Sequence, residues 1–354
     1  EISVLGHSFT TSGYASPFTE WLGNMSYSDR WKGYPFGTVP ATMSPVYLWD
    51  LLDDRRVDYR IYGENYFLFT RAYRIFVDKF GAPSKLARKF YDKTIKEAAG
   101  EDRGQEFNEL TRPYWGRVAT REDAYRLMGE PQFVKALSRF LTDDDTFARA
   151  VATDTVLRRK FADYLYHYPF SYRSWDLKVS DLDRVREWKK DFETQVRLGN
   201  VAPLHYIWLP NDHTDGNKTK ILNAFQFMAQ NDAALGRILE IISHSPVWKD
   251  SLVLVVEDDA QNGSDHVDAT RTIAFAAGPY VKRGAVVSDR YDQLSMLRTI
   301  ELALGLRSAN LAEQRAAPMF GIFTDKPDFR PFVAPEPSKD LAPADAERLR
   351  ALGR

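Results

Sequence analysis

Residues 251–267 combine a short apolar run with side chains that can bind metal ions. The apolar part, residues 252–256, is rich in β-branched residues, and such a run is typical of a strand buried on both faces of a parallel sheet. The metal-binding side chains that follow it are Asp258, Asp259, Asp265 and His266. Open α/β sheets bind their ligands at the carboxyl ends of their strands, and carboxylates with imidazole suit a hard or borderline divalent ion. The pattern therefore predicts metal-assisted chemistry at the end of this strand.

A second polar cluster, Asn211-Asp212-His213-Thr214, follows another expected strand at 204–209. Loops after parallel strands emerge at one edge of a sheet, so the two clusters can converge there. Each cluster also has an ordinary structural interpretation. Adjacent acids after a strand often cap a helix and face solvent, and Asn, Asp and Thr all favour turns. The metal hypothesis depends on the two clusters meeting in space.

The composition indicates a globular protein and excludes several kinds of site. The chain has 354 residues, 44% hydrophobic and 14% aromatic, which is enough for one large domain or two ordinary ones. Its 48 basic and 49 acidic residues give a net charge of −1, so no long-range field favours nucleic acid or an anionic membrane. The absence of cysteine excludes thiolate metal sites and cysteine nucleophiles. No apolar run approaches the roughly 20 residues that cross a bilayer, so we expect no membrane span.

Strand and helix patterns alternate along the chain, which predicts an α/β fold with a mostly parallel sheet flanked by helices. Expected strands cover 57–64, 204–209, 252–256 and 272–277, and the main expected helices cover 181–197, 221–242 and 293–304. Residues 1–50, rich in Gly, Ser, Thr and Pro, predict a long irregular segment. The Pro-rich tail after residue 325 is expected to wrap the surface or to be partly disordered.

The segment from 70 to 165 differs from the rest because its apolar residues recur at helical spacing among many charges. It predicts a helical insertion or cap. We therefore divide the chain into an α/β core at 1–69 and 166–330, a helical insertion at 70–165 and a C-terminal tail at 331–354.

Six segments carry a resemblance to a known family: EISVLGH (1–7), YRIYGE (59–64), LPNDHT (209–214), VEDDAQNGSDHVD (256–268), GPYVKRG (278–284) and SMLRTIE (295–301). Together they resemble the phosphoesterase family of the alkaline phosphatase superfamily, which includes bacterial phospholipases C and acid phosphatases. The likeness is greatest to bacterial members that often follow a β-propeller. It implies an alkaline phosphatase-like core and hydrolysis of phosphoric esters.

The resemblance also implies a mechanism. A hydroxyl nucleophile activated by the metal displaces the leaving group in line, and a covalent phospho-enzyme is then hydrolysed. Ser3 matches the position of the nucleophile, although Thr10 and Thr11 are nearby hydroxyls, and His7 would face the same pocket. One or two divalent ions are implied, with zinc favoured over manganese, iron or calcium, since carboxylate-rich sites accept several metals.

Individual residues match the family's site as follows. Asp258 and Asp259 match the paired acids that hold the metal beside the nucleophile. His213 with Asp212, and His266, match residues around the second metal or the phosphoryl oxygens. The resemblance thus assigns His213 a catalytic role as well. Two further residues are expected to bind substrate: Asn211 and Arg271, the latter with a structural salt bridge as the alternative.

Two departures from the family pattern bear on activity. The first metal-binding motif of the family, a Glu-Asn pair, is expected upstream of Glu1, and Thr270 stands where relatives often have His. The alternatives to an active hydrolase are therefore a fragment that is inactive without its upstream strand and a degraded member that serves as a binding or scaffold domain. The family further implies a periplasmic or secreted protein, a small phosphate-ester substrate and an upstream β-propeller domain.

Overall fold

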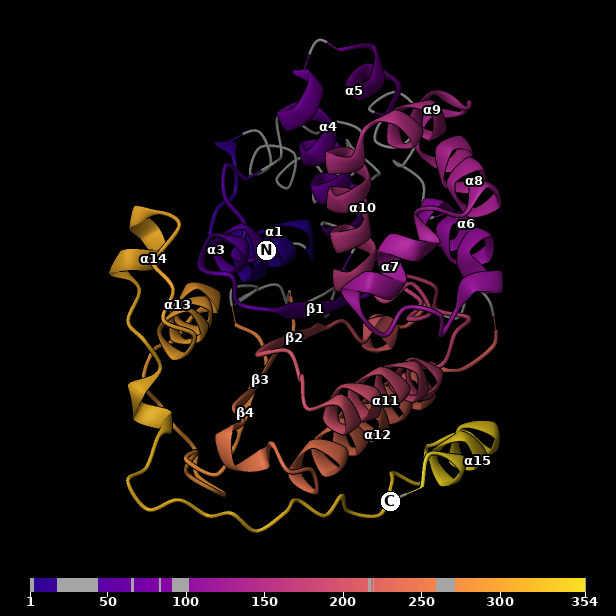
Figure 1. The fold of residues 1–354 in the computed structure, drawn as a ribbon. Helices are drawn as coiled ribbons and strands as arrows, with labels where there is room; N and C mark the ends of the chain where they lie inside the picture. Colours follow the sequence, from indigo (N-terminus) through magenta and orange to yellow (C-terminus); the bar gives the residue numbers. More distant parts are fainter. Residues whose placement is uncertain are drawn as a thin grey trace.

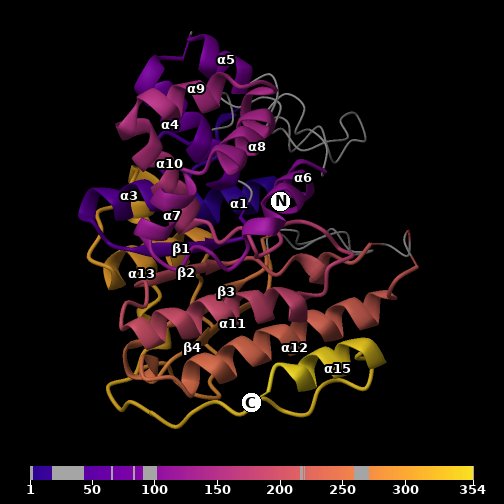
Figure 2. The same ribbon diagram turned by 45° about the vertical axis from the view of Figure 1, so that its right-hand side comes forward.

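The computed structural model describes residues 3–17, 44–64, 67–82, 84–90, 102–215, 218, 220–258 and 271–353. This part of the chain has a mixed α/β fold. Figures 1 and 2 show the strands in the middle of the molecule, with the helices of residues 72–167 on one side. The long helices α11 (Asp181–Leu198) and α12 (Ala224–Ser243) lie on the other side.

The described strands form two separate two-stranded sheets. Strand β1 (Tyr59–Tyr62) pairs in parallel with β2 (Leu204–Ile207), with Tyr59 opposite Leu204. Strand β3 (Val253–Val256) pairs with β4 (Ala274–Ala277), and this pair is antiparallel. The parallel pair confirms part of the expected architecture, whereas the single, mostly parallel sheet is not shown by the described residues.

The expectation that β3 is buried on both faces of a parallel sheet is wrong. All four residues of β3 are half-buried, and its partner strand is antiparallel. Leu254 and Val256 lie against a small apolar cluster of Met296, Met319 and Ile322. An apolar run indicates that a strand is at least partly buried, but it does not indicate whether the neighbouring strand is parallel or antiparallel.

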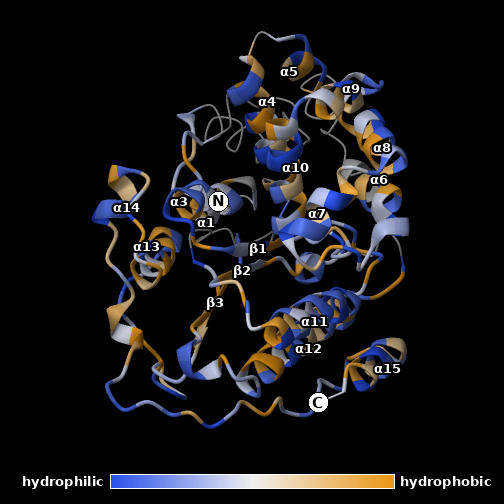
Figure 3. Cartoon of the chain, in the orientation of Figure 1, coloured by the Kyte–Doolittle hydropathy of each residue, from blue (hydrophilic) through white to orange (hydrophobic). Residues whose placement is uncertain are grey.

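The expected helices of the core are present and begin at capping residues. Ser180 accepts a hydrogen bond from Leu182 N at the start of α11, and Asn223 forms a capping box with Gln226 at the start of α12. Helix α13 (Gln293–Ala303) begins at Asp292 in the same way. Hydrophilic and hydrophobic residues share the surfaces of α11 and α12 (Figure 3), and their buried members form one apolar cluster around Trp188.

The segment expected to be a helical insertion consists, in the described residues, mainly of helices joined by short turns. Its helices are α4 (Ala72–Phe80), α5 (Lys85–Phe90), α6 (Asp102–Thr111), α7 (Arg121–Leu127), α8 (Pro131–Thr142), α9 (Thr146–Thr153) and α10 (Thr155–His167). Aromatic rings fill its centre, with Phe76 and Phe147 both in contact with Phe161. The same apolar cluster includes Tyr59 of β1, so these helices and the parallel strands share one core.

The expectation of an irregular N-terminal segment is wrong at Ser3–Ser12, which form helix α1. Residues Leu48–Arg55 form helix α3 ahead of β1. The Ser, Thr and Gly content of α1 disfavours a helix in isolation. Three hydroxyls instead bond back to carbonyls four residues earlier, namely those of Thr10, Thr11 and Ser12. Helix α1 also packs against α13, and such tertiary contacts outweigh weak intrinsic propensity.

The C-terminal tail wraps the surface as expected, but its end is ordered. After α14 (Leu311–Arg315) and an extended run, residues Pro343–Ala351 form α15, which packs against α11 and α12 (Figures 1 and 2). Leu352 is buried in the cluster around Trp188. Five short helical turns complete the described fold: η2 (Phe67–Arg71), η4 (Arg112–Tyr114), η5 (Pro210–His213), η6 (Trp248–Asp250) and η7 (Phe320–Ile322).

Candidate metal and phosphoester site

Three acidic or imidazole side chains from separate parts of the chain meet near the carboxyl ends of β1 and β3. His7 of α1 has its Nδ1 2.7 Å from Oε2 of Glu64, which follows β1. Its Nε2 lies 3.6 Å from Oδ2 of Asp258, which follows β3. The side chains of His7 and Glu64 are 7% and 0% exposed, whereas that of Asp258 is 33% exposed. The imidazole therefore bridges a buried carboxylate and one that reaches solvent.

A close approach of two backbones sets this geometry. A Cβ atom added at Gly6 would lie 1.9 Å from the backbone oxygen of Asp258. Only glycine allows α1 to come so near to the end of β3, and the next residue, His7, is thereby held against the Asp258 carboxylate. The Asp258 backbone oxygen also accepts a 2.9 Å hydrogen bond from Gln293 Nε2 of α13.

A row of aromatic rings joins the two histidines predicted to be catalytic. The His7 ring meets Trp208 edge-on at 4.8 Å between centroids, and Trp208 stacks on Trp175 at 5.8 Å. Trp175 in turn meets His213 edge-on at 4.8 Å. The His213 Nδ1 lies 2.8 Å from the backbone oxygen of Thr214. His7 and His213 thus lie at the two ends of a tryptophan pair.

The carboxyl of Asp212 is coupled electrostatically to the same region. Burial, and after it the negative charges of Asp181, Asp258 and Glu257, raise the pKa of Asp212 to about 7. Carboxylates near one another destabilise their own ionised forms, and a bound cation removes that repulsion. The negative charge of Asp258 therefore acts on the Asp212 carboxyl, after the larger effects of burial and Asp181.

Asn211 lies in a buried hydrogen-bond network beneath this loop. Its Nδ2 donates to Val179 O and to Gln230 Oε1, and its backbone N donates to Oδ2 of Asp181. Asp181 forms a fully buried ion pair with Arg184, 2.9 Å between Oδ1 and Nη1. The Asn211 side chain is used to hold turn η5 in place, and its predicted contact with substrate stays a prediction.

The other predicted residues divide into those described and those that are not. Ser3 is half-buried at the start of α1, four residues before His7, so the two lie on one face of the helix. Arg271 is exposed just before β4. Asp259, Asp265, His266 and Thr270 lie outside the described residues. Within the described ranges, no three His, Asp or Glu side chains stand together as a complete metal-binding set.

Comparisons with known proteins add no relative. No family model matches this chain. A comparison with curated proteins also finds no significant match. None of the helices of the described chain is long and apolar enough to cross a bilayer.

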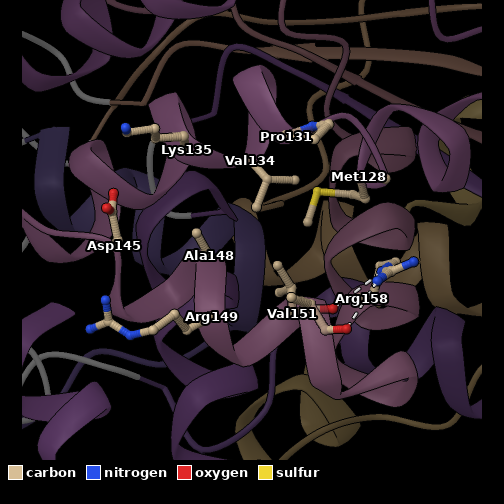
Figure 4. Close-up of a pocket in the computed structure, with 11 residues that line it drawn as sticks. Met128, Pro131, Val134, Lys135, Asp145, Ala148, Arg149, Val151 and Arg158 are labelled. Carbon is tan, nitrogen blue, oxygen red and sulfur yellow. Dashed lines mark hydrogen bonds between the residues drawn. The ribbon is translucent and has the colours of Figure 1, made fainter.

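A cavity of about 390 Å³ lies among the helices of residues 121–167 (Figure 4). It combines an apolar floor that includes Met128, Val134 and Val151 with three basic side chains, Lys135, Arg149 and Arg158. Arg158 is engaged by the protein itself, since its guanidinium donates to the backbone oxygens of Val151 and Ala152 at the end of α9. None of the predicted site residues lines this cavity.

Sequence reasoning missed Glu64 and the two tryptophans of the site. Glu64 directly follows Gly63, at the end of a correctly predicted strand, and the position alone was a signal because ligands gather at the carboxyl ends of parallel strands. No comparable signal marks Trp175 and Trp208, since an aromatic residue in a loop is indistinguishable in sequence from one that fills a core.

Proposed function

We propose that this chain is a metal-dependent phosphoric ester hydrolase. The observation that supports the proposal is the approach of His7 Nε2 to Asp258 Oδ2, 3.6 Å apart beside the ends of β1 and β3, with the charge of Asp258 also acting on Asp212. An imidazole with carboxylates is a donor set suited to zinc, manganese or iron. Asp258 and Asp212 would hold the ion, and the bound metal would supply Lewis-acid stabilisation of charge on the phosphoryl oxygens.

Helix α1 supplies the nucleophile in this proposal. Ser3, His7 and Thr10 follow one another at spacings of four and three residues, so they share one face of the helix. Thr10 Oγ1 bonds to the Gly6 and His7 carbonyls and lies 3.0 Å from the Tyr206 hydroxyl. Thr11 is fully buried and donates to His7 O. Ser3, at the end of the helix, is the hydroxyl best placed to meet an incoming substrate.

The reaction would proceed in two displacements at phosphorus. Ser3 Oγ attacks the phosphate ester, the bond to the leaving-group oxygen breaks, and a phosphoserine forms. Water then attacks the same phosphorus, the bond to Ser3 Oγ breaks, and phosphate leaves with the serine restored. The Trp208–Trp175 pair beside His7 excludes water from one side of the site and offers an apolar surface to the alcohol part of the substrate.

Hydrolysis of nitrophenyl phosphate and bis-nitrophenyl phosphate by the full chain, with zinc or manganese added, tests the proposal. We expect Asp258→Asn to lower turnover by more than about 100-fold, because loss of a metal ligand exceeds the 10–100-fold cost of losing an outer partner. Asp340→Asn, on the exposed tail, is the matched control and should turn over at the wild-type rate. Full activity in Asp258→Asn would refute the proposal.

Trapping of the phospho-enzyme distinguishes the candidate nucleophiles. Wild-type chain quenched in acid during turnover should yield a phosphopeptide that contains residue 3, and Ser3→Ala should yield none. Ser338→Ala, an exposed serine on the tail, is the control. A phosphopeptide that persists in Ser3→Ala and disappears in Thr10→Val would transfer the role to Thr10.

A further inference from the structure

We propose that His7 binds the metal through Nε2 and that Glu64 is the positioning residue that directs this nitrogen to it. The inference rests on the proposed function and assigns to His7 a ligand role beside Asp258, together with a role for Glu64 that the sequence did not indicate.

The hydrogen bond to Glu64 fixes which nitrogen of His7 carries the proton. An ionised carboxylate only accepts hydrogen bonds, so Nδ1, 2.7 Å from Glu64 Oε2, is the N–H donor. The Tyr206 hydroxyl is a second hydrogen-bond partner of Glu64. In the neutral imidazole, Nε2 then carries the lone pair, which is the form that binds metals.

The distance on the other side of the ring fits two ligands of one ion. His7 Nε2 and Asp258 Oδ2 are 3.6 Å apart, beyond the roughly 2.7–3.2 Å of an ordinary N–H···O hydrogen bond. Nitrogen and oxygen ligands bound at about 2.1 Å in a tetrahedral arrangement lie about 3.4 Å from each other. The pair is therefore too far apart for a direct bond and correctly spaced for a shared cation.

The surroundings hold the imidazole in this orientation. Trp208 meets the ring edge-on, and α1 lies against the end of β3 where Gly6 approaches the Asp258 backbone. Glu64 itself is completely buried. A carboxylate that bonds to the remote nitrogen of a metal-bound histidine is the usual arrangement in metalloproteins, where it fixes the tautomer and strengthens the ligand.

Zinc affinity of the full chain, measured without substrate by competition with a chromophoric chelator, tests the inference. We expect Glu64→Gln to bind zinc about 10–100-fold more weakly than wild type, and His7→Ala and Asp258→Asn to lose more than that. His244→Ala replaces a histidine at the end of α12 and should bind zinc like wild type. Wild-type affinity in His7→Ala, with affinity lost in Asp258→Asn, would overturn the role of His7 and leave the proposed function intact. A wild-type chain that binds no zinc would refute both.

Nitrogen NMR of the histidine-labelled chain provides a second test, with a readout other than affinity. We expect the signals lost in His7→Gln to be those of an Nδ1–H tautomer whose Nε2 resonance moves when zinc is added, whereas those of His167, which also donates through Nδ1, to Tyr59 O, should not move. A His7 ring that carries protons on both nitrogens in the presence of zinc, or one that zinc leaves unshifted, would overturn the inference.

Discussion

Replacement of Gly6 by alanine tests whether the approach of α1 to β3 determines the site. The added Cβ would lie 1.9 Å from a backbone oxygen, where real Cβ contacts below 3.0 Å essentially never occur. Helix and strand end must therefore separate by about 1 Å or more, and a displacement of that size near a catalytic group can cost about 100-fold in rate. Zinc affinity should fall as well, because His7 moves away from Asp258.

The stability of the same variant can be estimated from two opposing effects. Alanine in place of glycine favours a helix by up to about 1 kcal/mol, whereas overpacking costs about 1–3 kcal/mol. We expect a net loss of about 1–2 kcal/mol in the free energy of unfolding, measured by urea denaturation. Gly236→Ala is the matched control, since Gly236 also lies in a helix, α12, and an added Cβ would meet only Ala334 Cβ at 3.7 Å.

The control should gain stability, by about 0.5–1 kcal/mol. A Gly6→Ala chain that gains stability as the control does, and that keeps wild-type zinc affinity and turnover, would show that the contact between α1 and β3 does not hold the site together.

Two further predictions concern buried carboxyl groups. Burial, and then the neighbouring Glu301, raise the pKa of Glu313 to about 8 from the 4.5 expected in the unfolded chain. Folding favours the protonated form of Glu313, so the stability that this group contributes is complete below about pH 4.5. It is lost as the pH rises to about 8, by no more than about 1.4 kcal/mol per pH unit. Urea midpoints that fall less with pH in Glu313→Gln than in wild type would confirm this, and equal slopes would contradict it. Asp181→Ala leaves Arg184 buried without its charge partner and should lower the free energy of unfolding by about 3–5 kcal/mol. The control Asp340→Ala, on the exposed tail, should lower it by less than about 0.5 kcal/mol. A small loss in Asp181→Ala would show that turn η5 is held by other contacts.

Much of the secondary structure could be predicted because its signals are local. Strand β1, the cap at Ser180 and the helical spacing in α12 are each encoded within about twenty residues. The pairing of β3 could not be predicted, because a short apolar run is compatible with either a parallel or an antiparallel neighbouring strand. Helix α1 was missed for a related reason, since its Ser and Thr residues favour a helix only when α13 and the strand ends surround it.

The candidate site was predicted in part. The clusters after β2 and β3 were predicted because several acids and imidazoles follow two apolar runs, and the charge of Asp258 acts on the Asp212 carboxyl. Their convergence on one metal ion stays a prediction. The position of Glu64 beneath His7 depends on the packing of α1 across β1 and β3, which no local pattern records. The C-terminal helix α15 was also missed. The segment before it is Pro-rich, and the sequence does not indicate that Leu352 and Asp345 pack against α11 and α12.

Anomalous X-ray diffraction from crystals of the full chain grown with zinc tests the central claim most directly. We expect an anomalous peak within about 2.0–2.2 Å of both His7 Nε2 and a carboxylate oxygen of Asp258, with Glu64 still bonded to Nδ1. Zinc-grown crystals without a peak at the ends of β1 and β3, or with zinc bound only at surface side chains, would contradict it.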